Sequence, residues 1–107
     1  MKFLKVFLAS VLLTLTFSPA IAQEGTAGVS SNQQGNIVYF SVYNTTESTV
    51  CMFPYVISQN NVNGQVVPMI QIGPGETGVN IGAYGQANTD YAWSIQVGAK
   101  YRTGTCA

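Results

Sequence analysis

The sequence contains no histidine and very few charged residues. Only 7% of its 107 residues are Asp, Glu, Lys or Arg, against about a quarter in ordinary soluble domains. Without histidine the chain lacks the commonest general base and metal ligand, and it cannot form a Ser-His or Cys-His nucleophile pair. These absences argue against an enzyme, so we expect a binding or structural protein that needs no cofactor.

The charged residues argue against further classes of function. Residues 23–107 carry two basic and four acidic side chains, a net charge of −2. They offer no basic patch for nucleic acid, no acidic loop for calcium, and no spacing that pairs two carboxylates as a glycosidase needs. We therefore expect no nucleic-acid partner, no metal site and no catalytic residue. The remaining enzymatic alternative is a hydrolase whose active site uses an unrecognised pair of acidic side chains that includes Glu76 or Asp90.

The first 22 residues have the three parts of a secretory signal peptide. Two lysines open the segment, residues 6–17 are almost entirely apolar, and the small residues Ala20 and Ala22 stand at the cleavage-determining positions. The apolar run is too short to span a bilayer stably. The sequence predicts a signal peptide over 1–22 and a mature protein that is secreted or periplasmic, without stable membrane insertion.

Two cysteines remain after this segment, Cys51 and Cys106. In an oxidising compartment they predict a disulfide. A cross-link that closes a loop of about 55 residues would stabilise the fold by roughly 4 kcal/mol, which matters in so small a domain. A catalytic thiol or a metal pair is the competing interpretation, and no histidine or third cysteine supports it.

Alternating side chains indicate an all-β fold. Val38, Phe40 and Val42 fall on one face of a strand, whereas Tyr39 and Tyr43 fall on the other. The expected strands span residues 36–43, 49–57, 65–72, 77–81 and 91–102, the last being one long strand or two folded about Gly98. We predict a domain over 36–107 that forms a small antiparallel β-sandwich, immunoglobulin-like or a small barrel. Residues 23–35 would form a flexible leader or a weak first strand.

Glycine, proline and asparagine mark the connections. Residues 58–64 predict a hairpin loop, residues 73–76 a type II turn with Pro and Gly at its centre, and residues 82–89 an open loop. Pro54 and Pro68 cannot donate to a strand ladder, so each predicts an edge strand or an irregularity.

The resemblance to immunoglobulin-like domains is one of architecture. Domains with the Cys…Trp…Cys pattern place the tryptophan shortly after the first cysteine, whereas Trp93 lies far from Cys51 and close to Cys106. In size, export and strand pattern the chain is similar to small periplasmic β-sandwiches such as the chaperone-like proteins of amyloid-fibre systems. This similarity implies a chaperone or inhibitor, with extracellular fibre subunits as one class of partner.

Four tyrosines are the candidate binding residues: Tyr39, Tyr43, Tyr55 and Tyr84. Tyrosine supplies a large amphipathic contact area and is enriched at interfaces. A tyrosine face among Asn and Gln could also stack on sugars. The alternative is that this second face of the sheet is itself packed.

These observations favour a non-enzymatic binding protein that engages a protein partner. It would use the tyrosine-rich face or a strand edge interrupted by Pro54 or Pro68, to which an extended segment of the partner adds. Lys100 and Arg102 could pair with an acid on a neighbouring strand, protect an edge from aggregation, or contact the partner. The low charge leaves self-association open. The alternative function is a small secreted effector or toxin that acts on another cell.

Overall fold

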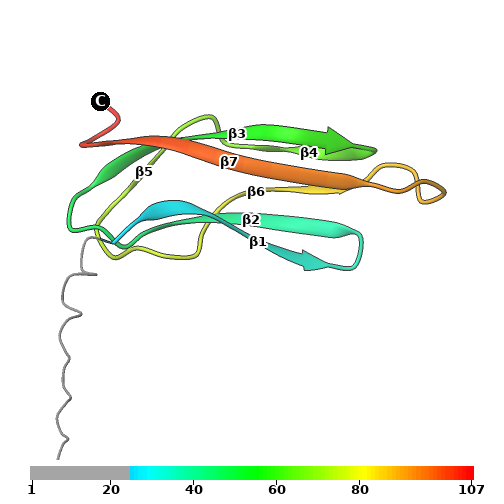
Figure 1. Ribbon diagram of the computed structural model, residues 1–107, viewed down its shortest axis with the longest axis horizontal. Helices are drawn as coiled ribbons and strands as arrows, with labels where there is room; N and C mark the ends of the chain where they lie inside the picture. The colour runs from blue at the N-terminus through cyan, green and yellow to red at the C-terminus, as the bar shows by residue number, and fades with distance from the viewer. Residues whose placement is uncertain (1–24) are drawn as a thin grey trace, which may run out of the picture.

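The computed structural model describes residues 25–107, which form seven strands in two antiparallel sheets (Figure 1). The first sheet has the order β1-β2-β6-β4 and comprises β1 Ala27–Gln34, β2 Ile37–Asn44, β6 Val79–Gln86 and β4 Val62–Val66. The second has the order β5-β3-β7 and comprises β5 Ile70–Ile72, β3 Val50–Asn60 and β7 Ser94–Thr103. The predicted all-β fold with two antiparallel sheets is confirmed. The predicted signal peptide lies outside the described residues.

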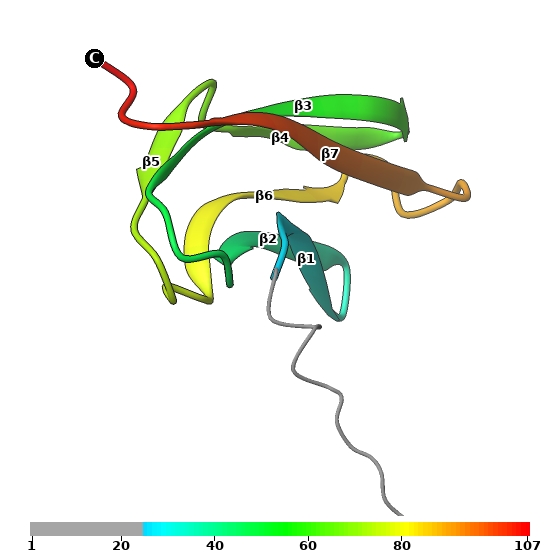
Figure 2. The same cartoon turned by 60° about the vertical axis from the view of Figure 1, so that its left-hand side comes forward.

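The core lies between the two sheets, which face each other as layers in Figure 2. Val38, Phe40 and Val42 of β2 are buried there, as their alternation predicts. From the opposite sheet, β3 contributes Val50 and Met52. Among residues 25–107, no helix is long and apolar enough to cross a membrane.

At one end of the sandwich, the buried Asn44 side chain holds the connections between the sheets. Its Nδ2 group donates hydrogen bonds to the carbonyls of Ser48, Ile72 and Gly73, at 2.8, 3.1 and 3.1 Å. Its Oδ1 atom accepts one from the backbone N–H of Thr46 at 3.0 Å. One amide therefore ties the end of β2 to the end of β5.

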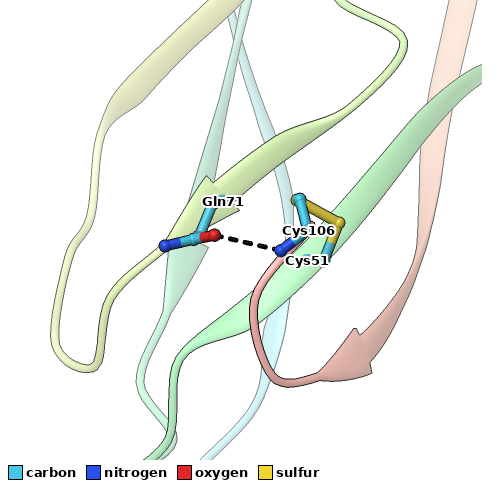
Figure 3. The surroundings of a disulfide bond; sticks show 3 residues. All are labelled: Cys51, Gln71 and Cys106. Carbon is cyan, nitrogen blue, oxygen red and sulfur yellow. Dashed lines mark hydrogen bonds between the residues drawn. A yellow bond between two sulfur atoms is a disulfide. The ribbon is translucent and has the colours of Figure 1, made fainter.

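The disulfide lies at the same end. Cys51 and Cys106 are joined, with 5.0 Å between their Cα atoms, which confirms the predicted pairing. Figure 3 shows the Gln71 side chain beside the bond, where its Oε1 atom accepts a hydrogen bond from the Cys106 N–H at 3.0 Å. The C-terminal segment is thereby held against the second sheet, and Cys51 is fully buried.

Two short turns use residues with special backbone freedom. The Gly73–Glu76 turn is of type II, as predicted: Gly75 has a φ of 82°, and the Glu76 N–H bonds to the Gly73 carbonyl at 3.2 Å. The hairpin between β1 and β2 turns at Gly35, whose φ is 63°. Positive φ at the first central position is the geometry of a type II′ turn.

Three predicted connections are wrong. Residues 58–64 form no hairpin, because β3 and β4 belong to different sheets and the chain crosses between them at Asn61, whose φ is 55°. The predicted strand 65–72 is two strands, and the chain changes sheets around Pro68. The predicted open loop at 82–89 continues β6 as far as Gln86.

The prolines occupy positions that the ladder tolerates. Beyond Met52, β3 has no neighbour on the β5 side, because β5 pairs only with residues 50–52. Pro54 therefore stands where the otherwise central β3 has become an edge, and the bulge in this strand comes later, between Val56 and Ser58. The last strand is a single strand that continues through Gly98.

We predict that replacing both cysteines with alanine lowers the free energy of unfolding by roughly 4 kcal/mol, because the cross-link restricts a long loop in the unfolded chain. Urea unfolding of the variant, beside the oxidised and reduced wild-type protein, measures this change. Equal midpoints for the oxidised and reduced protein would contradict the prediction.

We also predict that Asn44→Ala lowers the free energy of unfolding by about 3 kcal/mol, because it leaves buried carbonyls without a donor. Asn44→Asp keeps the shape but cannot donate, so it should be at least as destabilising. Thermal unfolding measures both variants. Asn63→Ala on the exposed β4 is the matched control and should change stability little.

Candidate functional site

The four candidate tyrosines lie on three different surfaces. Tyr39 and Tyr43 share the outer face of the first sheet, where Tyr39 is 38% exposed. Tyr43 lies over Gly28 of β1, whose missing side chain leaves room for the phenol. Four residues of extended strand place the two tyrosines about 13 Å apart. Together with the exposed Ile37, they form an uncharged face among amide side chains.

Tyr84 and Tyr55 do not belong to this face. Tyr84 is buried in the core and makes an edge-to-face contact with Phe40, with 6.3 Å between ring centroids. Tyr55 is exposed on the outer face of the second sheet, beside Gly98 and Ile57. The structure therefore brings only Tyr39 and Tyr43 together.

A different feature runs along one side of the sandwich, where β1 and β7 meet. Each is the last strand of its sheet, and no strand pairing joins them. Their Cα atoms nevertheless approach within 8 Å. We call this boundary the β1–β7 seam, and it leaves two strand edges unpaired.

The backbone groups on the β7 edge follow from the pairing with β3. Pro54 has no N–H, so its pairing with Ala99 must be of the non-hydrogen-bonded kind. The N–H and C=O groups of Ala99 consequently point away from β3. By alternation, those of Val97 and Tyr101 do the same. The free edge of β7 thus presents a row of unpaired donors and acceptors.

The backbone groups of β1 alternate between β2 and the seam in the same way. Just before this strand, the Thr45 N–H bonds to the Thr26 carbonyl at 2.8 Å, so Thr26 faces β2. Alternation then turns the backbone groups of Val29 and Ser31 away from β2 and toward the seam.

The seam opens onto two hollows whose walls are partly apolar and partly polar. One hollow of about 110 Å³ is lined by Val29, Ser30, Ser31, Phe40, Ile95, Gln96 and Val97. A second, of about 300 Å³, is lined by Gln33, Val38, Trp93, Ser94 and Ile95. The inner face of a strand added here would therefore meet valine, isoleucine and aromatic side chains together with serine and glutamine.

A larger hollow, of about 410 Å³, lies where the chain passes from β4 to β5. Its walls are Gln65, Val66, Val67, Pro68, Asn80, Ile81 and Gly82. No ionisable side chain lines it, so it offers no acid–base chemistry.

Lys100 and Arg102 lie on the outer face of β7, and both are exposed. Their partners in the strand register are Phe53 and Cys51, so the suggested pairing with an acid on the neighbouring strand is wrong. Because β7 is an edge strand, the interpretations as edge protection or partner contact both stay open.

The acidic residues are spread over separate connections. Glu47 lies between β2 and β3, Glu76 between β5 and β6, and Asp90 between β6 and β7. The Glu76 carboxylate accepts a hydrogen bond from the Gly73 N–H at 2.7 Å, which is a turn-stabilising contact. Within residues 25–107, no three His, Cys, Asp or Glu side chains are grouped as a metal would require.

Sequence reasoning missed the seam because strand order is not visible in alternation. Two signals pointed toward it. Gly35-Asn36 between strand-like segments is a dipeptide typical of two-residue hairpin turns, which marks β1 as a paired strand. Lys100 and Arg102 close together on one strand are typical of an exposed edge.

Comparison of the chain with protein-family models, curated proteins and solved structures found no match.

We predict that Tyr84→Ala lowers the free energy of unfolding by about 3 kcal/mol, because it empties a buried aromatic site. Tyr39→Ala should cost less than about 1 kcal/mol, because its ring is partly in solvent. Urea unfolding of the two variants tests the division between core and surface tyrosines. A similar loss of stability in both would show that Tyr39 is structural.

Proposed function

We propose that this chain is an exported, non-enzymatic binding protein that captures an extended segment of a partner protein on the free edge of β7. The observation that carries the proposal is the β1–β7 seam: two unpaired strand edges face each other beside hollows whose walls combine apolar side chains with serine and glutamine. Strand addition uses such an edge, since the backbone supplies affinity and side-chain pockets supply selectivity. The disulfide is compatible with an oxidising compartment.

The width of the seam indicates how capture would proceed. Paired antiparallel strands have Cα atoms about 4.5–5.5 Å apart, and a strand inserted between two others needs about 9.5 Å between them. Where β1 and β7 approach within 8 Å, the seam is too narrow for insertion. The partner segment would therefore add to β7 as the N-terminal end of that strand moves away from β1.

The packing of this part of the sandwich supports such a movement. Trp93, Ile95 and Val97 are only partly buried against the core, and contacts between partly buried side chains give little stabilisation to a closed seam. The firmly held end, at Asn44 and the disulfide, is the opposite one. The seam can thus open at its Trp93–Val97 end without loss of the whole fold, while Lys100 and Arg102 stay paired with Phe53 and Cys51 at the firmly held end.

In this mechanism the capturing edge is that of β7, and not an edge interrupted by Pro54 or Pro68. Pro54 blocks part of the free edge of β3, because proline cannot donate to an added strand. Pro68 lies between β4 and β5, outside any strand. The face with Tyr39 and Tyr43 remains a second contact surface, next to β1.

A protein that holds extended segments in this way would act as a chaperone or an inhibitor of assembly. A captured segment has its backbone groups paired and its apolar side chains covered, so it cannot join another strand. Extracellular fibre subunits are one class of client with such segments.

We predict that Ala99→Pro abolishes partner capture while the domain stays folded. Proline at this position removes only an N–H that points into the seam, so the β3–β7 hydrogen bonds remain. The mature wild-type protein and the variant are immobilised and exposed to envelope and culture-supernatant proteins of the source cell. Proteins retained by the wild type and lost by the variant support the proposal.

Ala99→Ser is the matched control, because it keeps the N–H and should retain the same proteins as the wild type. The double variant Tyr39→Ser/Tyr43→Ser separates the two surfaces. Loss of capture in this double variant, with full capture by Ala99→Pro, would assign binding to the tyrosine face and refute capture on the β7 edge.

A further inference from the structure

The two cations on β7 point to the chemistry of the captured segment. We infer that it carries acidic side chains at alternating positions, opposite Lys100 and Arg102, and apolar side chains at the positions between them. This inference rests on the proposed capture at the β7 edge, and it adds the chemical class of the partner.

The placement of the acids follows from strand geometry. Side chains of neighbouring strands that share a face lie about 4.5–5.5 Å apart at Cβ, and opposite charges there attract. Lys100 and Arg102 are two residues apart on the outer face of β7, and both are exposed. On their other side, β3 presents Phe53 and Cys51, which carry no charge. An added strand is thus the neighbour that can supply carboxylates on this face.

The inner face of the added strand sets the apolar positions. Ile95, Val97 and Ala99 point inward from β7 and pack partly against the core. Residues of the added strand that share this face would cover the two seam hollows, whose walls include Val38 and Phe40. Burial of apolar side chains there is favourable, whereas a charge would lose its hydration.

A second copy of this chain cannot supply the acidic segment. If two β7 edges paired antiparallel about Tyr101, Lys100 of one copy would lie opposite Arg102 of the other, and like charges in that position are destabilising. The four acids of residues 23–107 are Glu24, Glu47, Glu76 and Asp90, and no two are alternate neighbours. The acidic segment therefore belongs to a different protein.

Trp93 supplies a readout at the site itself. It is the single tryptophan of the chain and lines the larger seam hollow. A segment that covers this hollow changes the solvent exposure of the indole, so its fluorescence reports binding.

The test uses the mature, oxidised protein and three synthetic peptides in which valine alternates with glutamate, serine or lysine. Trp93 fluorescence is titrated with each peptide at low and high salt. We expect the glutamate peptide to bind about five-fold more tightly than the serine peptide at low salt, and the lysine peptide to bind most weakly. High salt should remove the preference.

Lys100→Gln/Arg102→Gln is the matched variant, because it keeps two long polar side chains without charge. It should bind the glutamate and serine peptides equally, at the wild-type affinity for the serine peptide. The inference of an acidic segment is overturned if the wild type binds the glutamate and serine peptides equally, or if the preference for glutamate persists in this variant. Edge capture itself is still supported in either case, provided that Ala99→Pro abolishes binding. If no peptide binds, edge capture and the acidic segment are both overturned.

Discussion

The buried amide of Asn44 is the interaction on which the arrangement of the two sheets depends. It ends β2 in one sheet and donates to carbonyls at the end of β5 in the other. The disulfide fastens the C-terminal segment to β3 at the same end. Among residues 25–107, the largest fully buried side chains lie in this half of the sandwich: Val42, Asn44, Val50, Cys51, Met52, Ile72 and Ile81. The strongest constraints are therefore concentrated at one end.

The opposite half is held more loosely, and the proposed capture of a partner segment depends on this asymmetry. Trp93 and Ile95 are only partly buried, Ile57 is about half exposed, and β1 and β7 approach without pairing. A domain with few charges and unpaired edges is at risk of self-association. Lys100 and Arg102 place its basic charge on one of those edges. In the proposed capture, the same pair would attract an acidic segment of the partner.

Alternation and cysteine count predicted most of the local structure. Val38, Phe40 and Val42 point inward as expected, Cys51 pairs with Cys106, and the last strand takes the first of its two predicted forms, a single long strand. The errors fall where the chain changes sheets. At Asn61 the chain crosses between sheets and forms no hairpin, and at Pro68 it crosses between two strands that were predicted as one. A turn residue predicts that the chain bends, but it does not predict which sheet the next strand joins. Tyr84 falls within the loop predicted at 82–89, because Gly82 and Gly85 on either side of it are residues typical of turns.

The sequence by itself determined the segments that form β2, β3 and β7, the inward face of β2, the turn at Pro74-Gly75 and the covalent link. Each depends on neighbours along the chain or on the presence of two cysteines alone. Only the tertiary structure decided that β1 and β7 are the edges that meet, that Tyr84 is in the core, and that Tyr55 lies far from Tyr39. Edges and shared faces depend on contacts between residues distant in the chain, where burial of the whole core, and not local preference, selects the strand order.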